Sequence, residues 1–130
     1  MEKQIFYHDT DAGGVVYYAN YLKYMEEARV EFFRQKNLSE TAIDGQAVFY
    51  PVRQCVITYH KPALYGERII CSATVKKITP ARIIFDQKVT NAKTGELLVD
   101  AGITLACVRA DNFQLMRIPE SVLKQLTTCL

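Results

Sequence analysis

A single helical stretch stands ahead of four long strand-like segments, and this arrangement limits the folds open to the chain. Apolar residues recur at helical spacing, which predicts one helix from about Ala19 to Lys36 that Asn37 terminates. Residues 38–47 are expected to form a loop. The helix should bury one stripe of side chains, made of Tyr21, Met25, Ala28 and Phe32 and widened by Leu22 and Phe33.

The remainder of the chain predicts an antiparallel sheet. Segments rich in Val, Ile, Thr, Phe and Tyr favour strands at residues 2–8, 50–60, 67–78, 82–91 and 96–109. Residues 79–81 and 91–95 have the composition of hairpin connections, and Pro119 marks the start of a closing helix. We therefore expect an α+β fold, with a curved antiparallel five-stranded sheet wrapped around one long helix. The hotdog fold and the cone-shaped, cystatin-like fold both meet this description.

Length and charge narrow the classes of function. A chain of 130 residues is expected to form one domain, residues 1–130. Its 16 basic and 14 acidic residues are spread along the chain, which argues against a nucleic-acid binder. We expect no secretory leader and no integral membrane segment, and hence a cytoplasmic protein. The cysteines form no CxxC pair and are expected to be buried thiols: Cys55, Cys71, Cys107 and Cys129.

The segment from His8 to Tyr21 carries the most chemical information. Asp11 lies in a turn beside Gly13 and Gly14, where the backbone can approach a ligand, and the helix begins just afterwards. Unpaired N–H groups at a helix start can hold an oxyanion while a carboxylate attacks or activates water. Each part also has a structural interpretation, since aspartates cap turns and tyrosines pack helices. The combination favours acyl transfer.

The same segment resembles the hotdog thioesterases of the 4-hydroxybenzoyl-CoA thioesterase and YbgC type. The resemblance rests on the run from Asp9 to Tyr17 (DTDAGGVVY), on residues 19–22 (ANYL) and on residues 27–29 (EAR) of the helix. Further support comes from residues 57–59 (ITY) with Pro62-Ala63. The order of elements agrees over nearly the whole chain. The resemblance implies the hotdog fold and hydrolysis of acyl-CoA thioesters to a free acid and coenzyme A.

Roles for individual residues follow from this resemblance alone. Asp11 would be the catalytic carboxylate, acting as nucleophile or as general base, and the Tyr18 N–H would polarise the thioester carbonyl. Gly14, Val15 and Tyr17 would shape the substrate pocket. Asp9 would hold the turn, and Asn20 would fix the helix entry or contact substrate. Many YbgC-type members carry His where this chain has Tyr18, so a different acyl preference is expected.

The sequence also bears on ligands and on assembly. No cofactor is implied, and His8, Asp9 and Asp11 have no specific metal-ligand spacing. His60 is expected at the surface or the core edge, with a place near the pocket as the alternative. Candidates for the phosphates of coenzyme A are Lys61, Lys76, Lys77, Arg82 and Arg109. An exposed sheet edge and the family resemblance predict a homodimer with shared active sites, or a homotetramer. Alternative functions are a non-catalytic acyl-CoA-binding module and a hotdog hydratase or dehydratase.

Overall fold

The computed structural model of the protein describes residues 1–38 and 48–128. Its helices are α1 (Asn20–Gln35), α2 (Glu120–Thr127) and a 3-10 turn, η1 (Tyr7–Asp9). Its strands are β1 (Glu2–Gln4), β2 (Val48–Phe49), β3 (Val52–Tyr59), β4 (Arg68–Cys71), β5 (Thr74–Ile78), β6 (Arg82–Asn91), β7 (Leu97–Ala106) and β8 (Val108–Arg109). Among the described residues, no helix is long and apolar enough to cross a membrane.

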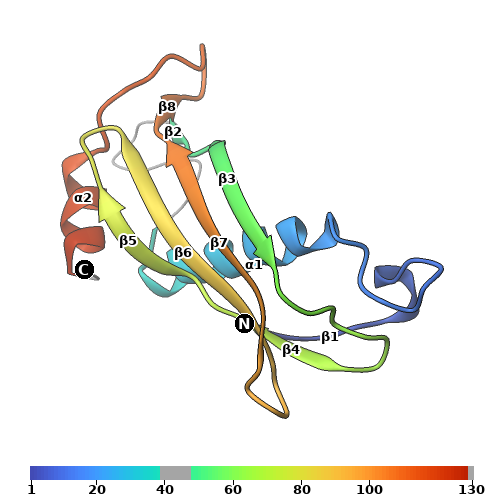
Figure 1. The fold of residues 1–130 in the computed structure, drawn as a ribbon. Coiled ribbons are helices and arrows are strands. Elements are labelled where there is room, and N and C mark those ends of the chain that lie inside the picture. The colour runs from blue at the N-terminus through green and yellow to red at the C-terminus, as the bar shows by residue number, and fades with distance from the viewer. Residues whose placement is uncertain (39–47, 129–130) are drawn as a thin grey trace.

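Most of the strands form one large antiparallel sheet, with α1 against one of its faces (Figure 1). Strand order is β1-β4-β6-β7-β3, and β5 also pairs with β6. The predicted α+β architecture, one long helix against an antiparallel sheet, is therefore confirmed, with two corrections to the strands. The segment predicted as one strand, 67–78, divides into β4 and β5, so the large sheet has six strands and not five. A separate pair is formed by β2 and β8.

Hydrogen bonds explain where the predicted strands are interrupted. Between β4 and β5, the carbonyl of Ser72 accepts the side-chain amide of buried Gln87 at 3.2 Å, and the Ser72 hydroxyl accepts the Lys88 N–H. Side chains thus replace part of the ladder at this point. The first predicted strand, 2–8, ends at Gln4 because residues 7–9 coil into η1. The predicted strand 96–109 divides into β7 and β8. Strand β7 belongs to the large sheet, whereas β8 lies outside that sheet and pairs with β2.

Helix α1 begins and ends within one residue of the expected positions. Asn37, just beyond it, has a φ of 57°, which confirms its predicted role as terminator. Tyr21, Met25 and Ala28 are buried as expected, and so is Phe33, whose ring meets that of Phe85 on β6. Leu22 is 44% exposed, so its place in the buried stripe was wrong. The sheet covers a narrower stripe of the helix, which Tyr24 completes in place of Leu22.

A buried polar contact also joins the helix to the sheet. Gln87 of β6 is fully buried; its amide donates to the carbonyl of Met25 at 3.0 Å and its side-chain oxygen accepts from Arg29 at 2.8 Å. Burial of polar groups is tolerated when they are hydrogen-bonded in this way. The contact fixes α1 on the sheet. Of the cysteines, Cys71 and Cys107 are buried as predicted and Cys55 is half-buried, while Cys129 lies outside the described residues.

Candidate active site

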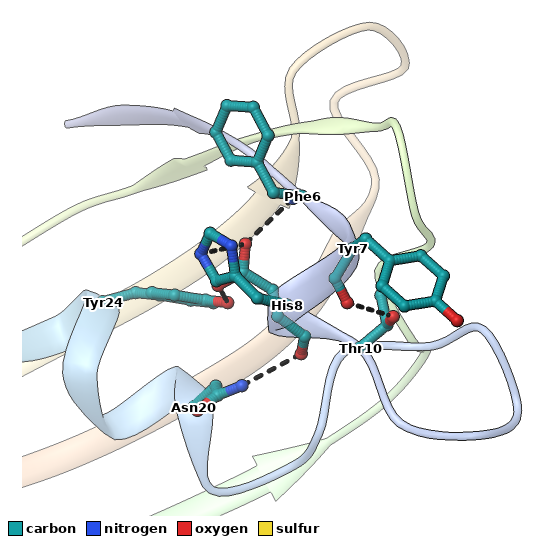
Figure 2. A network of polar contacts seen from close by, with 7 residues as sticks. Phe6, Tyr7, His8, Thr10, Asn20 and Tyr24 are labelled. Atoms are coloured by element: carbon teal, nitrogen blue, oxygen red, sulfur yellow. Dashed lines mark hydrogen bonds and ion pairs between the residues drawn. The ribbon is translucent and has the colours of Figure 1, made fainter.

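Asp9 anchors the loop that leads into α1, and Figure 2 shows its partners Phe6, Asn20 and Tyr24 around this loop. Its buried carboxylate accepts a hydrogen bond from the Tyr24 hydroxyl at 2.7 Å and another from the Phe6 N–H at 2.9 Å. The backbone carbonyl of Asp9 accepts the side-chain amide of Asn20 at 2.9 Å and the Tyr17 N–H at 3.0 Å. Asp9 thus links the backbone at Phe6 and Tyr17, on either side of the loop, to the side chains of Asn20 and Tyr24 on α1.

The charge of Asp9 is stabilised by these same contacts. Burial alone would raise the pKa of its carboxyl, but the hydrogen bonds from Tyr24 and Phe6 and the nearby charges of Lys3 and His8 hold that pKa below its ordinary 3.8. Asp9 is therefore ionised at neutral pH. Burial first, and then the Asp9 carboxylate, raise the pKa of Tyr24, which keeps its hydroxyl protonated as a donor.

Asp11 lies on the exposed side of the same loop. Its Oδ1 accepts the Gly13 N–H at 2.8 Å, while its Oδ2 accepts no hydrogen bond from the described residues. A Cβ on Gly13 would lie 3.2 Å from Oδ1, so glycine leaves room for the carboxylate. Gly14 has a φ of +78°, which a side chain would strain. The loop therefore presents one carboxylate oxygen that is free to act on a ligand.

The backbone between Asp11 and α1 is held by residues that are distant in sequence, at the end of β3 and just after it. Val16 N–H donates to the Ala63 carbonyl at 2.9 Å, and the Tyr59 hydroxyl donates to the Tyr18 carbonyl at 3.1 Å. In the ranges 1–38 and 48–128, the Tyr18 N–H donates to no backbone or side-chain acceptor. A free, fixed N–H just before a helix is a donor suited to a developing oxyanion.

A cleft of about 250 Å³ opens beside this loop. It is walled by the loop, by the first turn of α1 and by the segment that follows β3. Its lining residues are Asp11, Val15, Val16, Tyr18, Tyr21, Tyr59, His60, Lys61 and Pro62. A carboxylate, an aromatic wall that carries hydroxyl groups and one imidazole thus lie together in one concave site, which makes it the candidate active site.

The structure brings together three of the residues predicted for the site. Asp11, Val15 and Tyr18 line the cleft, whereas Gly14, Tyr17 and Asn20 are outside its lining. Gly14 shapes the turn, and Asn20 bonds to Asp9, which is the helix-entry contact expected of it. Its alternative substrate contact stays a prediction, as does the pocket-shaping role of Tyr17, whose ring is 45% exposed and packs on Tyr18.

Other cleft residues were missed by sequence reasoning or given a different place. Tyr59 and Pro62 were noted only as part of the family pattern, and Tyr21 only as helix packing. His60 is partly exposed, as expected of a surface or core-edge residue, and it also lines the cleft, which was the alternative place predicted for it. Lys61 is the one phosphate candidate in the lining. The other candidates lie towards the opposite end of the long strands, on β5, β6 and β8 (Figure 1).

No metal-ligand cluster adds to this chemistry. In the part of the chain that the structure describes, no three His, Cys, Asp or Glu side chains are grouped as ligands. His8 instead approaches the buried carboxylate of Asp9, with 3.7 Å between its Nε2 and Oδ2.

Comparison with known proteins identifies the family to which this fold belongs. The sequence matches the thioesterase-like superfamily over residues 7–126. The chain therefore belongs to that family, and its assignment as a thioester hydrolase is confirmed.

Particular relatives place it more closely, in the YbgC group. The chain is 30% identical to the acyl-CoA thioester hydrolase YbgC of Escherichia coli over 94% of its own length and 90% of that protein. It is 31% identical to the acyl-CoA thioesterase YbgC of Haemophilus influenzae, over 92% and 87% of the two chains. The crystal structure of a DHNA-CoA thioesterase from Staphylococcus aureus superimposes with a TM-score of 0.88, at 25% identity, over 98% and 87%.

Proposed function

We propose that the protein hydrolyses acyl-CoA thioesters to a carboxylic acid and coenzyme A. One observation carries the proposal: in a member of the thioesterase-like superfamily, the carboxylate of Asp11 lines a cleft directly ahead of a helix start. The relatives named as acyl-CoA thioesterases support the choice of acyl-CoA as substrate. A module that only binds acyl-CoA would gain nothing from a carboxylate beside the thioester, because a negative charge there does not favour a neutral acyl group.

The proposed chemistry assigns separate tasks to the carboxylate and the backbone. The Asp11 carboxylate either attacks the thioester carbonyl, which forms a mixed anhydride, or takes a proton from the attacking water. In both routes negative charge develops on the carbonyl oxygen. The Tyr18 N–H, which has no acceptor among the described residues, would bind that oxygen, aided by the positive end of α1.

Thiol release from a panel of acyl-CoA substrates tests this function. We expect the purified protein to release free coenzyme A from at least one aromatic or aliphatic member of the panel, detected with a thiol reagent. The tyrosine wall of the cleft (Tyr18, Tyr21 and Tyr59) can pack against either kind of acyl group. Acyl-CoA that binds tightly and is never cleaved would instead support the binding module.

We also propose a homodimer that joins the sheets of two chains at β3. This strand forms one edge of the large sheet and, among the described residues, pairs only with β7. It exposes 50% of Val52 and 61% of Val56. An open edge with apolar side chains invites pairing, and a two-fold axis closes the assembly.

The mass in solution provides the check on this assembly. Sedimentation equilibrium is expected to give twice the 14.8 kDa mass of the chain, or four times that mass if two dimers associate. A monomer at micromolar concentration would contradict the proposal. Replacement of Val56 by lysine places like charges near one another across the shared edge, and is expected to weaken the dimer.

A further inference from the structure

His60 and Asp100 form a hydrogen-bonded pair, and the chemistry proposed for Asp11 and Tyr18 assigns no role to it. The Nε2 of His60 lies 2.7 Å from Oδ2 of Asp100. The register explains this contact, because Thr58 of β3 lies directly opposite Asp100 of β7, and His60 follows two residues later on the same side. The backbone N–H of His60 also donates to the Leu98 carbonyl at 2.8 Å, which fixes the main chain beyond the end of β3.

The contact with Asp100 determines which ring nitrogen of the neutral imidazole carries the hydrogen. An ionised carboxylate can only accept hydrogen bonds, so the Nε2 facing Asp100 must carry a hydrogen. The other ring nitrogen, Nδ1, accepts no hydrogen bond from the described residues and is the atom left to exchange a proton. An aspartate that orients an imidazole in this way sets its tautomer and stabilises the ring when it is charged.

His60 also shares the cleft with the residues proposed to act on the thioester. It lines the same cleft as Asp11 and Tyr18, and its side chain is 42% exposed. Lys61, the neighbouring cation in the lining, is paired with Glu96 at 2.7 Å. Among the lining residues His60 is the only imidazole, the side chain best suited to move protons near neutral pH.

We propose that His60 is the catalytic residue that protonates the sulfur of coenzyme A as the thioester is cleaved, and that Asp100 positions it. When the C–S bond breaks, its electron pair stays on sulfur, and the sulfur takes the Nδ1 proton of the imidazolium. The ring is left neutral with its hydrogen on Nε2, the form that Asp100 holds. It regains a proton from solvent, which its partly exposed side chain contacts.

This inference rests on the proposed thioesterase activity, yet it assigns a step that both routes for Asp11 leave open. Whether the carboxylate attacks or activates water, a thiolate must leave. Alkyl thiolates are fairly basic, with the cysteine thiol near pKa 8.5, so a proton donor assists their departure. Aryl thiolates are less basic and leave without such help.

The proposal predicts that the loss of kcat in a His60 variant depends on how basic the leaving thiolate is. We expect His60→Ala to lower kcat for an acyl-CoA about 100-fold, the lower end of the range for a general acid. With an aryl thioester of the same acyl group, the loss is expected to stay below about 10-fold. Asp100→Asn should show the same contrast, because its amide can donate to Nε2 and disfavour the productive tautomer.

Controls separate this inference from the proposed function. Glu2→Gln removes an exposed ion pair, with Arg68, at the opposite edge of the sheet, and is expected to change neither rate. Equal losses on both thioesters, or full activity in His60→Ala, would overturn the role of His60 while wild-type activity stands. No thiol release by the wild-type protein from any substrate would instead overturn the proposed function. Circular dichroism would confirm that each variant is folded.

Discussion

Replacing Asp11 by asparagine is expected to lower the turnover of acyl-CoA at least about 100-fold. Asparagine has nearly the same shape, and its side-chain oxygen can still accept the Gly13 N–H. The variant therefore keeps the turn, but it loses the negative charge that either attacks the carbonyl or takes a proton from water. Thiol release measured at saturating substrate reports this loss as a fall in kcat.

The matched control is Asp111→Asn. Asp111 is also exposed, but it pairs with Arg109 beside β8, far along the chain from the cleft. We expect this variant to retain the wild-type rate, so a fall limited to Asp11→Asn would reflect the cleft and not a change of net charge. Retained activity in a correctly folded Asp11→Asn protein would show that the Asp11 carboxylate is not the catalytic group.

The nature of the Asp11 contribution can be resolved in the same system. If Asp11 is the nucleophile, a single turnover in ¹⁸O-labelled water places label in the carboxylate of Asp11 whenever water attacks the anhydride at the aspartyl carbon. If Asp11 is a general base, label enters only the acid product. Mass spectrometry of the loop peptide distinguishes the two routes that sequence reasoning left open.

Local patterns in the sequence predicted the elements that depend on neighbouring residues. The bounds of α1 followed from its apolar spacing, and the turn at Asp11 from two glycines of which Gly14 adopts a positive φ. The hairpin between β6 and β7 likewise followed from the turn residues at 91–95. These features are set within a few residues of chain, which is the range that periodicity and turn composition report.

Features that depend on long-range contacts were not predictable in this way. Tyr59 and His60 reach the cleft because β3 pairs with β7, and His60 meets a carboxylate 40 residues further on. The break between β4 and β5 depends on Gln87, a side chain from another strand. Leu22 has the polarity and spacing of a core residue, but the sheet does not cover it. None of these contacts leaves a periodic signal in the local sequence.

Removal of the Tyr24 hydroxyl, in Tyr24→Phe, is expected to lower the free energy of unfolding by about 2 kcal/mol at neutral pH. The hydroxyl donates to a carboxylate that is buried and ionised, and hydrogen bonds to charged groups are among the stronger ones. Tyr7→Phe is the matched control, because Tyr7 is 80% exposed and its hydroxyl donates no hydrogen bond to the described residues. Urea unfolding of the three proteins provides the comparison.

The pH dependence of the stability lost in Tyr24→Phe shows whether the loss comes from the hydrogen bond to the Asp9 carboxylate. The pKa of Asp9 is lower in the folded protein than its ordinary 3.8, so its ionisation stabilises the fold above about pH 4. That contribution disappears as the pH falls through the folded pKa. Without the Tyr24 hydroxyl the folded pKa rises, because burial is less opposed, and the variant loses stability at a higher pH than the wild type. Once Asp9 is protonated in both proteins, the charge-assisted part of the bond is absent from each, so their difference should narrow in acid. A difference that stays constant from pH 7 to pH 3 would mean that Tyr24 stabilises the loop by packing alone.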